Sequence, residues 1–470
     1  MFELELSYTL LLIICLVAAA GFEFVNGFHD TANAVATVIY TNSLKPWVAV
    51  IWSGMMNSLG VFLGGITVAM GIVNLLPVET LIDQNIVHSI SMIGALLISA
   101  IGWNLLTWYF GIPCSSSHTL IGSILGVGIA YSFLPEAVGT AVNWSKATEI
   151  GLSLLISPLF GFSVTIVLMY FLRVMTKGKP HGDDLFKEPK KHAPPPPWIR
   201  GILLLTCTLV SFFHGQNDGQ KGVGLIMLIL IGIVPGYFAL NASFDTTKLS
   251  EPLNKIEQVL GVVDPNPLSI IDRNALSESK EIEARMKKHI DSTATVNDLP
   301  RNERFALRKD ILILDRNLNN LMKKEEARLS EIDKKVLKTN LKQIRKVTDY
   351  SPGWVIFLIS ISLGLGTMIG WKRIVKTIGE KIGKEHLTYA QGASAELVAA
   401  STIGMSTYFG LPVSTTHVLS SGIAGSMVAN KGVKNLQPST VRNILLAWFL
   451  TLPVVMIMSG SLFLLFRTIF

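Results

Sequence analysis

The chain has 470 residues, of which 50% are hydrophobic and only 16% are charged, and its mean hydropathy is +0.47. This balance is expected when most of a chain is dissolved in lipid, so a soluble protein is excluded. The formal net charge of +7 does not indicate nucleic acid binding, because the basic residues lie in loops beside apolar segments, as the positive-inside rule explains.

Apolar segments of about the 20 residues that a helix needs to cross a bilayer recur along the chain. They lie near residues 7–26, 47–76, 86–110, 115–134, 147–173, 199–240, 352–370, 387–409, 414–430 and 443–467. We therefore predict an all-α polytopic membrane protein with about 10–12 transmembrane helices.

The first residues, MFELELSY, contain two glutamates and no Lys or Arg. They lack the cationic start of a cleavable signal peptide, so we expect a retained first helix. The three cysteines, Cys15, Cys114 and Cys207, lie in apolar segments and are odd in number. We expect them to pack in the interior rather than form disulfides or a metal site.

Two hydrophilic regions divide the chain. Residues 174–197 contain several lysines and end in a run of prolines, which is typical of a stiff polar linker. Residues 241–350 are rich in both charge signs and place leucine and isoleucine at helical spacing, which predicts a soluble helical insert. The predicted first membrane repeat is then residues 1–173, and the second is residues 198–240 and 351–470.

The two halves contain related motifs in the same order. Residues 27–34 read GFHDTANA and residues 110–120 read FGIPCSSSHTL; in the second half, residues 215–222 read GQNDGQKG and residues 409–419 read FGLPVSTTHVL. The spacing between the motifs differs by about the length of the charged insert, so a single insertion accounts for the mismatch. These matches indicate an internal repeat.

Charge in the loops predicts that the repeats are inverted. The linker and the loop at residues 371–386 are basic, so both should be cytoplasmic, whereas the first-half loop LPVETLIDQN has no Lys or Arg. Two segments on the same side of the membrane must be separated by an even number of crossings. If residues 199–240 and 352–370 each cross once, the insert between them lies on the outer side. Inverted repeats with broken helices or re-entrant hairpins are common in secondary transporters, which bind substrate near the midplane.

Asp30 and Asp218 occupy equivalent places in the repeats. An ionised carboxylate at the centre of a membrane helix costs about 2.5–3.5 kcal/mol, so a bound cation, a proton or a partner side chain should compensate it. The alternative is a carboxylate that only caps a broken helix. Nearby glycines favour either unwound or closely packed backbone: Gly27, Gly215, Gly219 and Gly222.

The second pair of motifs favours an anion. Pro113 and Pro412 disfavour helix continuation, and each precedes a hydroxyl run and a histidine, His118 or His417. A helix that begins there offers free N–H groups, hydroxyls and a positive dipole end to an oxyanion. The alternative is ordinary N-caps with packed histidines. Because the aspartates would repel an anion, a proton or metal should bind with it, which is the logic of symport.

Together the four motifs resemble the inorganic phosphate transporter (Pit) family, and the likeness is closest to bacterial low-affinity phosphate permeases. It covers roughly residues 7–240 and 352–467. The resemblance implies a transporter, not an enzyme, in the bacterial cytoplasmic (inner) membrane, which takes up inorganic phosphate with a cation. It further implies a neutral divalent metal phosphate, with magnesium or a similar ion, as one form of the cargo.

By position, the resemblance assigns residues to two roles. Asp30 and Asp218 would handle the coupling cation and are also candidate metal ligands. Phosphate would be bound by Asn33, Asn217, Ser115, Ser116, Ser117, Thr119, Ser414, Thr415 and Thr416.

Two residues depart from the sodium-driven pattern of the family. His29 stands where that pattern has Asn and titrates near neutrality, and Lys221 stands where it has the last Asn of the second signature. We expect the Lys221 ammonium to replace a sodium ion beside Asp218, so that protons drive transport. The alternatives are sodium coupling, with Lys221 reaching an interface and His29 packing at a helix end.

Other functions remain open on the sequence alone. Sulfate has the same shape as phosphate, but hydrogen phosphate can donate a hydrogen bond to a carboxylate and sulfate cannot. A Ser-His-Asp hydrolase is disfavoured, because adjacent Ser117 and His118 do not supply the required geometry. A passive channel is a further alternative function. A homodimer is one possible assembly of the chain.

The topology is testable with protease on sealed membrane vesicles. We expect cleavage within residues 241–350 in right-side-out vesicles and protection of this region in inverted vesicles, because the parity of the spans places it outside. Cleavage of the insert from the cytoplasmic side alone would refute the inverted arrangement.

Overall fold

The computed structural model describes residues 4–76, 86–135, 142–180, 182–189, 193–291 and 295–469, and its regular elements in these ranges are helices. Most of the loop LPVETLIDQN, together with Lys190 and Lys191 of the linker, lies outside the described residues. The chain forms two compact units. We call residues Leu230–Tyr350 the insert unit, and residues Glu5–Ile229 with Ser351–Phe470 the membrane unit.

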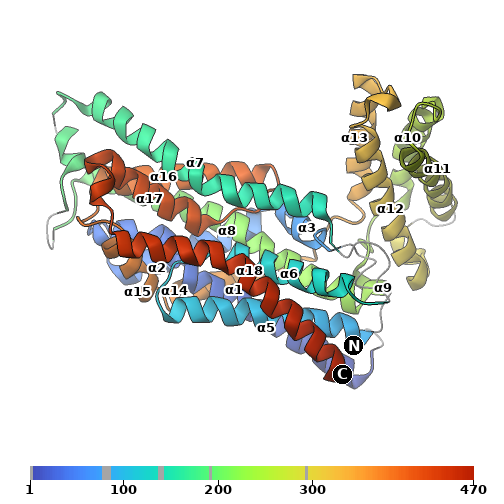
Figure 1. Cartoon of the computed structure of the whole chain (residues 1–470), viewed down its shortest axis with the longest axis horizontal. Helices are drawn as coiled ribbons and strands as arrows, with labels where there is room; N and C mark the ends of the chain where they lie inside the picture. The colour runs from blue at the N-terminus through green and yellow to red at the C-terminus, as the bar shows by residue number, and fades with distance from the viewer. Residues whose placement is uncertain are drawn as a thin grey trace. The chain divides into compact units, whose positions relative to one another are not determined.

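The helices of the membrane unit run side by side and follow the same order in each half (Figure 1). The first half contains α1 (Leu6–Tyr40), α2 (Pro46–Leu63), α3 (Thr67–Val73), α5 (Ile86–Tyr109), α6 (Ser116–Ser132) and α7 (Trp144–Thr176). The second contains α8 (Pro197–Ile233), α14 (Gly353–Met368), α15 (Lys372–Lys376) with the π-turn Thr377–Lys381, α16 (Tyr389–Tyr408), α17 (Thr415–Lys431) and α18 (Pro438–Ile469).

Matching irregularities in the two halves are consistent with the predicted repeat. The chain breaks after α2 at Gly65 and after α14 at Gly370, and both glycines have φ +76°. This left-handed conformation favours glycine, which lacks a Cβ. Pro158 lies inside α7, and Pro453 lies at the corresponding place inside α18.

The all-α, multi-pass architecture predicted from sequence is confirmed, although fewer helices are of full membrane length. Six described helices are long and apolar enough to cross a bilayer, or up to seven if α14 and the bent segment Lys372–Lys381 form one span. The predicted segments at 115–134, 387–409 and 414–430 instead form α6, α16 and α17, which are short or polar arms of two hairpins.

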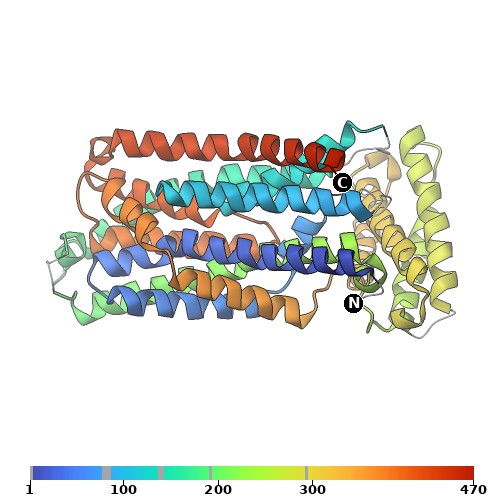
Figure 2. The same ribbon diagram turned by 90° about the horizontal axis from the view of Figure 1, so that it is seen from below.

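Each half packs its first long helix on the other half. α1 lies beside α14 (Figure 2), where a Cβ at Gly27 would be 2.4 Å from the Leu363 carbonyl oxygen. In the reciprocal contact, a Cβ at Gly215 of α8 would be 2.1 Å from the Asn57 carbonyl oxygen of α2. Such reciprocal contacts are those of a pseudo-two-fold repeat. They are consistent with inverted repeats, whose orientation stays a prediction.

The signature motifs lie on unbroken helix. α1 and α8 are continuous through Asp30 and Asp218, so neither carboxylate caps a broken helix and the backbone there is not unwound. Of the two alternatives for the neighbouring glycines, close packing is the one observed: these residues allow helices to approach each other, as small residues do in membrane proteins.

The insert unit has its own hydrophobic core. It is built from α9 (Pro235–Phe238), α10 (Ser250–Val262), α11 (Ile270–Asp291), α12 (Arg301–Leu321) and α13 (Glu331–Arg345). Buried Arg308 donates hydrogen bonds to the carbonyl oxygens of Ala239 (2.8 Å) and Thr348 (3.1 Å). This side chain therefore joins the start of the insert to its end.

The close contact at Gly215 predicts that alanine is destabilising at this position but not at Gly201, another glycine of α8. Gly215→Ala should lower the stability of the purified protein by about 1–3 kcal/mol, because the new methyl group meets backbone atoms that cannot turn away. Gly201→Ala is the matched control, since no atom lies within 4 Å of its Cβ position. Equal thermal unfolding curves for both variants would contradict the packing.

Candidate functional site

The two signature aspartates face one another across α1 and α8, with two side chains between them. Ser116 Oγ lies 3.2 Å from Asp30 Oδ2 and 3.3 Å from Asp218 Oδ2. His214 Nε2 lies 3.6 Å and 3.8 Å from the same two carboxylate oxygens. All four side chains are at most 3% exposed. The acids of both repeats therefore belong to one buried polar site.

Two hairpin tips reach this site. As predicted, helices begin after Pro113 and Pro412: Ser115 Oγ accepts a hydrogen bond from the His118 N–H, and Ser414 Oγ accepts one from the His417 N–H, both at 3.2 Å. The tips also touch, because Ser117 Oγ donates to the Val413 carbonyl oxygen at 2.8 Å. The N-termini of α6 and α17 are thus brought together at the aspartates.

The two halves of the site are related by the repeat. In one half, the Thr416 hydroxyl donates to Asp30 and accepts from Asn33 Nδ2 at 3.1 Å. In the other half, Lys221 stands in place of Asn33. Its Nζ donates to Asp218 Oδ1 (2.7 Å), Ser117 Oγ (2.5 Å) and the Val413 carbonyl oxygen (2.8 Å). Lys221 is 2% exposed, so it does not reach a membrane interface.

Several predicted residues are occupied by structural contacts. Ser115 and Ser414 cap their helices, and Thr119 Oγ1 donates to the Ser115 carbonyl oxygen at 3.0 Å. Asn217 braces the second tip: its Nδ2 donates to the Leu411 carbonyl oxygen and its Oδ1 accepts from the Val413 N–H, both at 3.2 Å. The geometry favours a positioning role for these four side chains rather than the direct phosphate contact predicted from sequence.

Four histidines in or beside the signature motifs form two groups. His118 and His417 have ring centroids 4.5 Å apart, and His417 stacks on Trp448 at 4.0 Å, so both pack as structural side chains. His29 lies at the edge of the site, with Nδ1 3.6 Å from Asp30 Oδ1 and Nε2 3.3 Å from Thr107 Oγ1. His214 lies between the carboxylates and was missed by the sequence analysis. The sequence could have identified His214, because residues four apart on a helix, such as 214 and 218, lie on the same face.

Unpaired polar atoms gather at this site. Four buried atoms without a hydrogen-bond partner belong to it: His29 Nδ1, Asn33 Oδ1, His214 Nε2 and Thr415 Oγ1. A buried polar atom without a partner is unfavourable by about 1–3 kcal/mol, so these atoms are suited to contact a bound ligand.

The donor set also fits a metal ion. Asp30, His214 and Asp218 each offer one ligand atom, and these atoms lie within 4.8 Å of one another. Carboxylate oxygens suit magnesium, while an imidazole nitrogen suits a transition metal better. Two carboxylates and one ammonium leave a single net negative charge when the histidines are neutral, so an anion requires additional positive charge.

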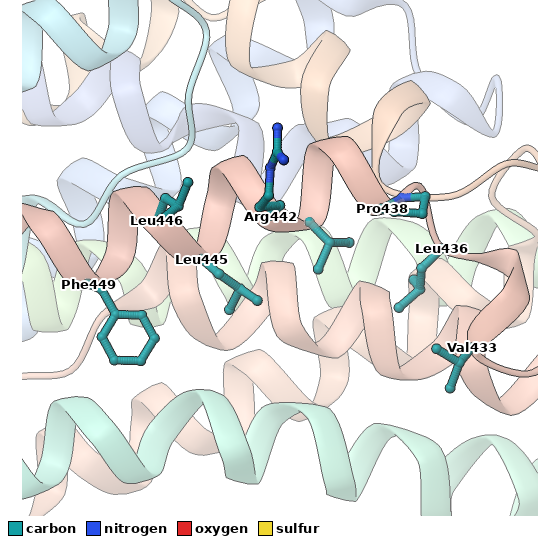
Figure 3. A pocket seen from close by; sticks show the side chains of 8 residues that line it. Val433, Leu436, Pro438, Arg442, Leu445, Leu446 and Phe449 are labelled. Atoms are coloured by element: carbon teal, nitrogen blue, oxygen red, sulfur yellow. The ribbon is translucent and has the colours of Figure 1, made fainter.

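A shallow apolar groove lies elsewhere in the membrane unit, at the start of α18 (Figure 3). Leu445 and Phe449 line it with Arg442, and no residue of the four signature motifs contributes to it. The buried polar centre, not this surface groove, is therefore the candidate functional site.

The Thr416 hydroxyl gives a direct test of the site. Thr416→Val keeps the shape but removes the hydrogen bond to Asp30, and it should slow labelled phosphate uptake about tenfold or more, because a hydrogen bond to a charged group contributes about 1.5–3 kcal/mol. Thr402→Val on α16 removes only a bond to its own helix and serves as the control. Equal uptake by the two variants would remove Thr416 from the site.

Comparison with known proteins identifies the family to which the chain is similar. The sequence model of the phosphate transporter family matches residues 26–459. The chain is 40% identical to the low-affinity inorganic phosphate transporter of Buchnera aphidicola subsp. Acyrthosiphon pisum, over 98% of this chain and 97% of that one. It is 38% identical to the low-affinity inorganic phosphate transporters PitA and PitB of Escherichia coli K12, with the same coverage.

A solved structure shares the fold. The sodium-dependent phosphate transporter aligns with a TM-score of 0.56 and 19% identity over 98% of this chain and 100% of that chain. The chain therefore belongs to the phosphate transporter family, a family of multi-pass membrane transporters and not of enzymes.

Proposed function

We propose that this protein carries inorganic phosphate across the bacterial cytoplasmic membrane by symport with cations, and that protons are the driving ions. Family membership supports phosphate as the substrate, and the relatives named above are bacterial low-affinity transporters of inorganic phosphate. The site supports the coupling to cations.

One observation carries the proposal. Asp30 and Asp218 are both buried within contact distance of Ser116, and Ser116 belongs to a hairpin tip built to receive an oxyanion. Phosphate near these carboxylates is repelled at low dielectric unless positive charge enters with it. Cation and anion therefore load together, so a cation gradient can drive the anion.

Lys221 favours protons over sodium. Its ammonium already donates to a carboxylate, a hydroxyl and a carbonyl oxygen, which are the oxygen types that a sodium ion would use. The His29 and His214 rings each lie 3.6 Å from a carboxylate oxygen of Asp30, and imidazole is a common proton carrier in proteins. A sodium-coupled mechanism is the second candidate, since the solved relative is a sodium-dependent transporter.

The same site is suited to a neutral metal phosphate as cargo. Asp30, His214 and Asp218 would hold the divalent ion, while the Thr415 hydroxyl, which has no hydrogen-bond partner, would face a phosphate oxygen. A neutral complex enters such a site without the repulsion that a free anion meets. Sulfate lacks the proton that phosphate can donate to a carboxylate, so excess sulfate should compete poorly with labelled phosphate.

Uptake into proteoliposomes tests the proposal. An inward proton gradient should drive phosphate accumulation in the wild type, and Asp30→Asn and Asp218→Asn should each abolish accumulation, because each removes a charge that binds the cation. Near-normal coupled uptake in either variant would remove that aspartate from the mechanism.

Two uptake measurements on the wild-type protein, one with a protonophore and one without sodium, identify the driving ion. Accumulation that stops when a protonophore is added and continues without sodium agrees with proton coupling. Accumulation that requires sodium and ignores the protonophore would overturn proton coupling in favour of the sodium-driven alternative.

A further inference from the structure

A further buried carboxyl group of the membrane unit, Glu23, lies outside the site described above. Glu23 of α1 is 0% exposed. Its Oε1 accepts a hydrogen bond from Asn26 Nδ2 at 3.0 Å, whereas Oε2 has no hydrogen-bond partner. Glu23 precedes Asp30 by seven residues, or two helical turns, which places it about 10 Å away along the same face of α1.

Helix packing brings Glu23 to the second half of the site. Its Oε2 would lie 2.5 Å from a Cβ at Gly222 of α8, so the absence of a side chain at Gly222 leaves room for the carboxyl in this position. Gly222 directly follows Lys221 and lies one turn beyond Asp218. From α14, the side chain that reaches the same point is Ile359, which is apolar.

The charged groups around Glu23 do not neutralise it. On α8 they are Asp218 and Lys221, and on α1 the nearest is Asp30. An ammonium group has three N–H donors, and the three hydrogen bonds of Lys221 go to Asp218, Ser117 and Val413. None is left for Glu23, while both aspartates repel a second negative charge. A neutral carboxyl group fits this position, and a carboxylate does not.

We propose that Glu23 is a proton-binding site of the transport cycle and that it holds its proton in the conformation of this structure. The inference rests on the proposed proton-coupled function and names the group that carries one of the protons. Glu23 takes a proton from water when the site is open to the outside, and only the neutral form permits closure of α1 on Gly222. The proton leaves when the opposite side opens and the carboxylate is hydrated again.

Glu23→Gln mimics the loaded form, because glutamine has the same shape and its carbonyl oxygen still accepts from Asn26. In proteoliposomes the variant should lose proton-driven phosphate accumulation by about tenfold or more, since nothing is left to carry that proton. Phosphate exchange in the absence of any gradient should continue, because it requires no proton cycle. Glu149→Gln is a control at a partly exposed glutamate paired with Lys146 on α7, and it should accumulate phosphate like the wild type.

Infrared difference spectroscopy reports the protonation of Glu23 without relying on transport. The wild-type spectrum at neutral pH should contain a protonated carboxyl C=O band that is missing in Glu23→Gln. Carboxylate bands in its place would overturn the proposal, as would normal proton-driven accumulation by the variant. Loss of exchange together with accumulation would also overturn it, because Glu23 would then serve folding or phosphate binding.

The outcomes separate this inference from the proposed function. If the wild type itself does not accumulate phosphate in a proton gradient, proton coupling fails. If the wild type accumulates phosphate and Glu23→Gln does so equally, proton coupling stands and only the role of Glu23 is refuted.

Discussion

The structure depends on two buried carboxylates that share their neighbours. Asp30 and Asp218 come from different halves of the chain, yet Ser116 and His214 lie within 4 Å of both. Two like charges at this separation in a medium of low dielectric repel each other strongly unless positive charge lies with them. Lys221 supplies one such charge. In the proposed function the cargo supplies the rest, and coupling between anion and cation follows from this charge balance.

Helix packing holds these groups close together. Glycines at the crossings of α1 with α14 and of α8 with α2 let the helix backbones approach, which fixes the two signature helices relative to each other. The hairpin tips then deliver helix N-termini to the carboxylates from both halves. Reciprocal packing of the two halves is consistent with the proposed transport function, in which one half would move against the other around the site.

Much of this was predictable because the signals are local. Hydropathy identified the apolar helices, prolines followed by hydroxyls marked the starts of α6 and α17, and repetition related Asp30 to Asp218. The three cysteines are buried and free, as expected for packing residues. Local patterns also misled in part, because they do not separate a full span from a hairpin arm or a tightly packed helix from an unwound one.

What sequence could not provide are contacts between residues far apart in the chain. The partners of Lys221 come from both hairpin tips, and the proximity of Glu23 to Gly222 arises only when α1 packs on α8. Asn217 is a predicted phosphate ligand by position, and the structure shows its side chain bonded to the Thr407 hydroxyl and to backbone groups of the tip. Such assignments depend on which atoms remain unpaired after folding, and a single sequence does not contain that information.

The central claim is that phosphate binds to this site only together with a proton or another cation. The most direct measurement is the dissociation constant of phosphate for the purified protein, determined at one fixed pH with and without magnesium, with and without sodium, and again after a change of pH. We expect affinity to rise by about tenfold or more when the accompanying cation is supplied, which corresponds to a coupling free energy of about 1.4 kcal/mol. An affinity that is indifferent to protons, sodium and divalent metal would contradict the account.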